Sequence, residues 1–97
     1  MVTLPRVLTL AEAPDFAKGL RQLVLAETGH AVLDASALTE FDSSALAVLL
    51  ECRREALAAG KGFSVRGLPA RLRQLAGLYG VAELIPATTE AVAAATA

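Results

Sequence analysis

Cysteine, histidine and tryptophan are almost missing from this 97-residue chain, which has one cysteine, one histidine and no tryptophan. The single cysteine, Cys52, excludes an internal disulfide and a zinc site built on cysteines. The single histidine, His30, excludes a metal site built on several histidines. We therefore expect no bound metal, and one free thiol agrees with a reducing cytosol.

Long apolar runs and a strong excess of charge are also missing. No stretch reaches the roughly 18–20 consecutive apolar residues of a membrane span. The first residues lack the basic-then-apolar pattern of a signal peptide. The formal net charge is −1, which gives no overall attraction to nucleic acid or anionic lipid. We expect a cytoplasmic protein that neither binds nucleic acid nor inserts into a membrane.

Aliphatic residues are what the chain has in plenty. It is 55% hydrophobic and 20% charged, with only 4% aromatic residues. This balance predicts one small folded domain with a core of leucine, valine and alanine. No Walker-type or dinucleotide-binding glycine pattern occurs in the sequence, so we expect no nucleotide cofactor.

Short β-prone runs alternate with helical patterns along the chain. The expected strands are residues 2–4, 7–10, 30–33 and 63–66, with 83–85 as a further short strand or extended segment. The expected helices are residues 11–27, 43–59 and 69–79. The first two strands are predicted to be edge strands or a hairpin. Strands alternating with helices predict βαβ crossovers and a parallel or mixed sheet.

Residues that favour chain ends and turns mark the boundaries of these elements. Asp42 or Ser43 should cap the second helix, because their side-chain oxygens accept from free backbone amides. Gly60 should end that helix in the left-handed conformation. Pro69 suits the first turn of the third helix. We expect the domain to span residues 1–86, and residues 87–97 to be a tail or short helix.

The second helix is apolar around more than half of its circumference. One row should face the sheet, and it holds Ala45, Leu49, Cys52 and Ala56. The adjacent row holds Leu46, Leu50, Arg53 and Leu57. Either a neighbouring helix covers this second row, or it is a partly exposed strip that binds another protein.

Ser43 is the most distinctive candidate for function. It suits a helix cap, and it equally suits a contact or phosphorylation position at a partner interface, because a helix N-terminus accommodates a phosphate. Catalysis by Ser43 is disfavoured, because no base or supporting motif such as Gly-x-Ser-x-Gly accompanies it. Asp34 and Asp42 are explained more simply by capping and loop hydrogen bonds than by a catalytic pair.

Two short segments, residues 34–38 (DASAL) and 42–46 (DSSAL), resemble the core of a STAS domain, the fold of anti-sigma-factor antagonists. Those proteins carry a serine or threonine directly after the second aspartate, where this chain has Ser43. The segments 65–69 (VRGLP) and 78–81 (LYGV) extend the resemblance. This later half is most similar to the stand-alone STAS subunit of bacterial Mla-type phospholipid ABC transporters.

The resemblance implies an α/β fold and a regulatory function. The fold would be a single STAS-like domain, a mixed sheet of about four to five strands packed by about three to four helices. The function would be that of a non-catalytic adaptor that binds and modulates the transporter's cytoplasmic ATPase, and so supports outer-membrane lipid asymmetry. Through that complex it would lie peripheral to the inner membrane. The alternative is an anti-sigma-factor antagonist that binds a kinase and is regulated by phosphorylation at Ser43.

These considerations predict a partner-binding surface at the start of the second helix and along its second row. No catalytic residue, cofactor or metal is expected. The predicted contact residues are Asp42, Ser43, Ser44, Leu46, Leu50, Arg53 and Leu57.

Overall fold

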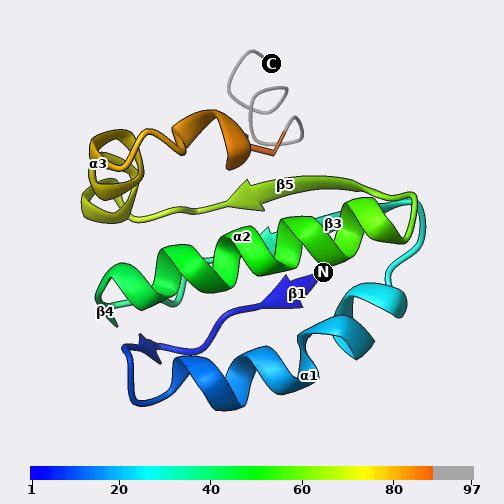
Figure 1. Cartoon of the computed structure of the whole chain (residues 1–97), viewed down its shortest axis with the longest axis horizontal. Helices are drawn as coiled ribbons and strands as arrows, with labels where there is room; N and C mark the ends of the chain where they lie inside the picture. Colours follow the sequence, from blue (N-terminus) through cyan, green and yellow to red (C-terminus); the bar gives the residue numbers. More distant parts are fainter. Residues whose placement is uncertain (89–97) are drawn as a thin grey trace.

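The computed structural model describes residues 1–88 and shows an α/β arrangement (Figure 1). The strands are β1 (Val2–Thr3), β2 (Val7–Leu8), β3 (His30–Asp34), β4 (Glu40–Phe41) and β5 (Gly62–Arg66). The helices are α1 (Ala13–Leu25), α2 (Ser43–Ala58), α3 (Ala70–Leu78) and the short 3₁₀ helix η1 (Ala82–Leu84). The three predicted α-helices and the four main strand segments are confirmed to within about two residues at each end.

The strands form two small parallel sheets, so the expected single mixed sheet is wrong. β3 lies between β1 and β5, and β2 pairs separately with β4. The hairpin alternative for the first two strands is also wrong, because each pairs with a later strand. Pro5 lies between β1 and β2 and has no amide to donate, so the pairing of this part of the chain is interrupted there and divides into two sheets. The backbone contacts resume beyond it, where the amides of Thr39 and Glu40 donate to the Arg6 carbonyl at 2.8 and 3.0 Å.

Helices α1 and α2 pack on the same face of the larger sheet (Figure 1). The strand order β1-β3-β5 requires this, because two right-handed crossovers in the same direction place both helices on one side. Leu33 on β3 and Leu49 on α2 are fully buried between these layers. The predicted interior strand is therefore confirmed. Val32 is only half-buried, because it points to the opposite face of the sheet.

Glycines in the left-handed conformation end the helices where the sequence predicts. Gly60 has φ +74° after α2, and Gly80 has φ +72° after α3. Pro69 lies one position earlier than expected, as the N-cap of α3. Within residues 1–88, no helix combines the length and the apolar character that spanning a membrane requires.

Three expectations about the end of the chain and the apolar stripes need correction. Residues 82–84 form η1 rather than a strand. Helical periodicity predicts Tyr79 on the apolar stripe of the third helix, yet it is 57% exposed because α3 ends at Leu78 and the chain turns away. The same periodicity predicts Leu23 on the apolar face of the first helix, yet it is 43% exposed because the neighbouring Val24 takes the inward position. The expected tail lies outside the described residues from 89 onwards.

Candidate partner-binding site

Asp42 fixes the start of α2 to the preceding part of the fold. One carboxylate oxygen accepts from the Ser44 amide at 2.8 Å, which is the N-cap bond. The other accepts from the Leu10 amide at 3.0 Å. The hydrogen bonds from Leu10 and then Ser44 hold the pKa of Asp42 below its ordinary value, because they favour the charged form. Asp42, not Ser43, is therefore the cap.

Ser43 is the first residue of α2, and it is exposed. Within residues 1–88, its hydroxyl makes no hydrogen bond, so its side chain is free to meet another molecule. Ser44 beside it is half-buried and contributes its amide to the cap. The start of α2 thus presents the free hydroxyl of Ser43 next to the Asp42 carboxylate, whose two oxygens already accept hydrogen bonds.

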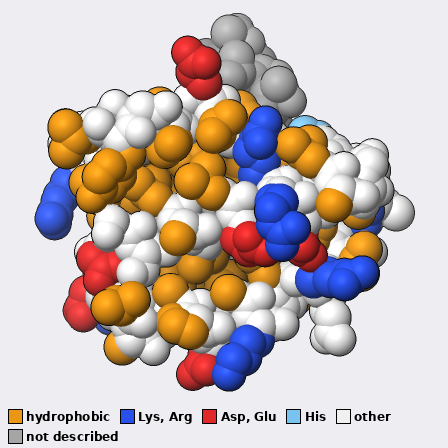
Figure 2. Space-filling model, viewed as in Figure 1, with side chains coloured by type: hydrophobic (Ala, Val, Ile, Leu, Met, Phe, Trp, Pro, Cys, Tyr) orange, Lys and Arg blue, Asp and Glu red, His pale blue; other side chains and the backbone are white. Residues whose placement is uncertain are grey.

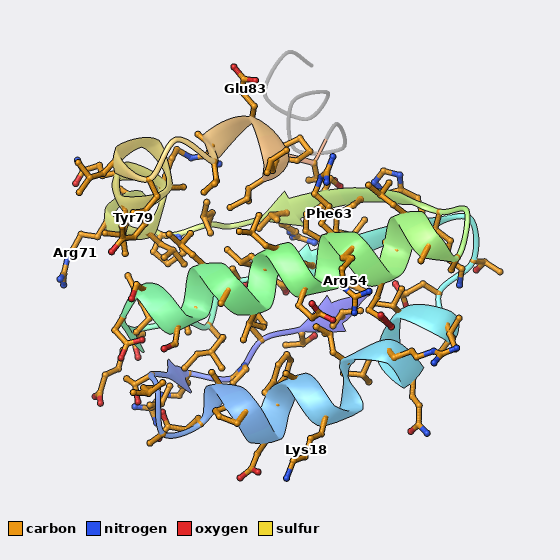
Figure 3. All side chains as sticks on the ribbon, viewed as in Figure 1. Lys18, Arg54, Phe63, Arg71, Tyr79 and Glu83 are labelled. Atoms are coloured by element: carbon orange, nitrogen blue, oxygen red, sulfur yellow. The ribbon has the colours of Figure 1, made fainter. Side chains whose placement is uncertain are left out.

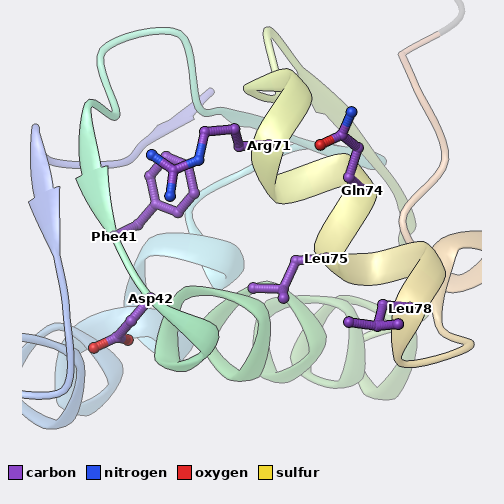
Figure 4. A pocket seen from close by; sticks show the side chains of 6 residues that line it. All are labelled: Phe41, Asp42, Arg71, Gln74, Leu75 and Leu78. Atoms are coloured by element: carbon purple, nitrogen blue, oxygen red, sulfur yellow. The ribbon is translucent and has the colours of Figure 1, made fainter.

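A hollow opens on the α3 side of this helix end (Figure 4). We call it the α3 hollow. It has a volume of about 430 Å³ and is lined by Phe41, Asp42, Arg71, Gln74, Leu75 and Leu78. The Arg71 guanidinium lies over the Phe41 ring, 5.8 Å from the ring centre. Leu78 is 79% exposed at its edge.

A second depression runs along the other flank, between α1 and α2. We call it the α1 groove. It has a volume of about 230 Å³ and is lined by Leu10, Ala13, Pro14, Ala17, Ser44, Ala47, Val48 and Glu51. Its lining is almost wholly apolar, and Leu10 is 70% exposed at its end. Hydrophobic side chains cover much of the molecular face that carries α1, α2 and α3 (Figure 2).

The second row of α2 is not the continuous exposed strip that was expected. Leu46 is 3% exposed and belongs to the core, so the expectation that it is accessible is wrong. Leu50 and Arg53 are half-buried, while Leu57 is 49% exposed. Helix α3 contacts α2. The second row is therefore covered at the start of α2, as one alternative predicts. It is exposed in the last turn, as the other alternative predicts.

The carboxyl-terminal half of α2 is polar and internally paired. Arg54 forms ion pairs with Glu51 and Glu55 on the solvent side of the helix (Figure 3). The Glu55 carboxylate also lies 3.9 Å from Arg21 of α1. After the turn at Gly60, the ammonium of Lys61 donates to the carbonyls of Val24, Leu25 and Glu27 at the end of α1.

Groups capable of catalysis do not converge on Ser43. The Nε2 atom of His30, the first residue of β3, lies 2.9 Å from the hydroxyl of Ser64 in the middle of β5. Ser43 lies beyond the opposite end of β3, so the two cannot form a nucleophile–base pair. Burial raises the pKa of the Cys52 thiol to about 12, which keeps it protonated and unreactive at neutral pH.

Other ionisable groups are equally accounted for by structure. The Asp34 carboxylate accepts from the Ser36 hydroxyl and amide, and these bonds lower its pKa. Within residues 1–88, no cluster of three or more metal-binding side chains occurs.

Residues that sequence reasoning missed line both depressions. Helical periodicity puts Arg71 and Gln74 on the polar side of the third helix, where they resemble solvated surface. Leu10 lies in an expected strand. Leu78 belongs to the 78–81 segment, and its place two residues before the helix-ending Gly80 is the one signal in the sequence.

Comparison with known proteins identifies one family. A family model described as "Mlab, STAS domain" matches residues 1–86. The matched range contains every element from β1 to η1, the start of α2 and both depressions beside it. No curated protein matches the chain.

Proposed function

The chain belongs to the STAS domain family, and we propose that it is a non-catalytic adaptor subunit that binds and modulates the cytoplasmic ATPase of a bacterial phospholipid-transport ABC system. STAS domains are generally non-catalytic regulatory domains that mediate protein–protein interactions. In this proposal the chain is cytoplasmic and reaches the inner membrane only through the transporter complex. Its contribution would be to outer-membrane lipid asymmetry.

One observation carries the proposal: the exposed start of α2 lies between two depressions, the apolar α1 groove and the partly polar α3 hollow. Leu10 and Leu78 at their edges are 70% and 79% exposed. An apolar centre with a polar rim is the usual anatomy of a protein interface. Ser43 and Asp42 would supply part of that rim. The proposed contact residues are Asp42, Ser43, Ser44, Leu50, Arg53 and Leu57, without the buried Leu46.

Two features favour the transporter branch of the family over other STAS proteins. The description of the matching model names Mlab together with the STAS domain. The segments 65–69 and 78–81 carry the resemblance to the transporter subunit. We also propose that residues 1–86 form the domain, although Ala87 and Thr88 still pair with Val65 of β5.

The test is capture of the native partner. The chain, expressed with an affinity tag in its own organism, is purified after crosslinking, and the bound proteins are identified by mass spectrometry. Recovery of an ABC ATPase, whose ATP turnover then changes on adding the pure chain, supports the proposal. Recovery of a small histidine-kinase-like anti-sigma factor in its place would contradict it. A Ser43→Asp sample processed in parallel separates site-dependent capture from background.

A second candidate function is favoured by the free hydroxyl of Ser43. An anti-sigma-factor antagonist would be switched by phosphorylation at Ser43, where the helix N-terminus stabilises added negative charge. Phosphate beside Asp42 would place about two to three negative charges together and repel a partner. Phosphoserine at position 43 in protein isolated from cells, with loss of the captured partner, would favour this function over ATPase docking.

A further inference from the structure

We infer that the α3 hollow receives an amphipathic helix of the partner, which places an apolar side chain between Leu75 and Leu78 and a carboxylate against Arg71. The inference rests on the proposed function, because it states what the ATPase presents at this site. It goes further in assigning Arg71 as the residue that selects and orients the partner.

The Arg71 side chain is positioned to bind a carboxylate of the partner. Its guanidinium lies over the Phe41 ring, which fixes the side chain and leaves its N–H groups available (Figure 4). Within residues 1–88, no carboxylate lies within ion-pair distance of it. Asp42, which lines the same hollow, directs its two oxygens to the amides of Leu10 and Ser44 instead. A bidentate pair with an incoming carboxylate is the contact that an arginine in this position favours.

The shape of the hollow favours a protruding side chain over a small molecule. Small-molecule sites enclose most of the ligand surface. Here Leu78 is 79% exposed and Leu75 is half-buried, so the apolar floor faces outward. The hollow lies where α3 meets the start of α2, and a depression beside two helices is a common seat for an amphipathic helix.

The two flanks of α2 differ in whether their charged groups are paired. Helix α3, with the sequence ARLRQLAGL, contains Arg71 and Arg73 and no acidic residue. On the α1 flank, Glu51 pairs with Arg54 and Asp15 pairs with Lys18. Because Arg71 has no carboxylate partner within residues 1–88, a partner helix gains most when its acidic residue lies toward α3.

The test compares Arg71→Glu with Arg73→Glu, an equal charge reversal on the same helix that does not line the hollow. Both proteins are titrated with the purified ABC ATPase captured by the parent chain, after melting curves show that they fold. We expect Arg71→Glu to weaken binding at least tenfold and Arg73→Glu to change it less than about twofold. If the parent binds and both variants bind alike, the inference is overturned while the proposed function stands.

A peptide pair tests the hollow without the ATPase. The probe is a synthetic amphipathic helix of about 15 residues with a leucine and a glutamate one turn apart, and its twin has lysine for glutamate. In NMR titrations of the parent, the acidic peptide should shift the resonances of Phe41, Arg71 and Leu78, and the basic twin should not. If no ATPase binds the parent, the proposed function fails, and the two peptides alone test whether the α3 hollow binds an acidic amphipathic helix. Equal shifts from both peptides, or none from either, overturn the inference.

Discussion

The two ends of α2 differ in whether their exposed polar groups have partners within the chain. At the carboxyl-terminal end, Arg54 pairs with Glu51 and Glu55, and Lys61 donates to the last carbonyls of α1. At the amino-terminal end, apolar edges remain exposed, and Ser43 and Arg71 have no polar partner within residues 1–88. The polar groups at the carboxyl-terminal end are thus paired within the chain, whereas those at the amino-terminal end are available to a second molecule.

This difference separates stability from binding along one helix. Changes to the paired groups at the carboxyl-terminal end, such as Arg54 and Lys61, should lower the free energy of unfolding and leave partner affinity alone. Changes at the amino-terminal end should do the reverse. The buried row between them supports both ends, so its loss should have the largest effect.

Leu49→Ala should give the largest effect, because it removes a fully buried side chain between α2 and the sheet. We expect a loss of about 2–5 kcal/mol in the free energy of unfolding, measured by denaturant titration. The control is Leu57→Ala on the same helix, which is 49% exposed. A loss below roughly 1 kcal/mol for Leu49→Ala would mean that another face of α2 meets the sheet.

Lys61→Met should have the next largest effect, because it removes the ammonium that caps α1 and keeps the apolar stem. The donated bonds to the carbonyls of Val24 and Leu25, at 2.9 and 3.1 Å, end. A loss of about 1 kcal/mol is expected, since hydrogen bonds from charged groups at a helix C-terminus contribute on this scale. Lys18→Met, at an exposed surface position, serves as the control. If the two variants melt alike, the cap contributes nothing to stability.

Asp42→Asn should have the smallest effect, and it should depend on pH. The folded-state pKa of Asp42 is lowered, so its charge contributes stability above the ordinary carboxylate pKa and loses it as pH falls through the lowered value. Asparagine still caps but does not titrate. We therefore expect the variant to melt slightly below the parent at pH 7, with the gap closing below about pH 4. An equal gap at both pH values would show that charge plays no part.

Much of the fold was predictable because local signals specify it. Alternating β-prone and helical patterns, the left-handed glycines and Asp42 are short-range features, and the elements they predict are present. The division into two sheets was not predictable, because Pro5 interrupts a pairing between segments about thirty residues apart. The burial of Leu46 likewise depends on how the other elements pack around α2, and helical periodicity does not determine that.

The candidate site was only half predictable for the same reason. Asp42 and Ser43 belong to a continuous motif, so the sequence identifies them. Arg71 and Leu10 reach the same surface from other elements, and their spacing in the sequence gives no sign of it. Arg71 on a polar helix face resembles any solvated arginine until the fold places it over the Phe41 ring.

The most direct test of the account places the same charge at each end of α2 and measures melting and ATPase binding together. Ser43→Asp adds a carboxylate where the helix dipole favours it, and Ala58→Asp adds one where the dipole opposes it. Ser43→Asp should leave the melting midpoint nearly unchanged and weaken binding tenfold or more, which is about 1.4 kcal/mol. Ala58→Asp should cost up to about 1 kcal/mol of stability and weaken binding far less than Ser43→Asp does. If both variants bind like the parent, the amino-terminal end of α2 is not the interface.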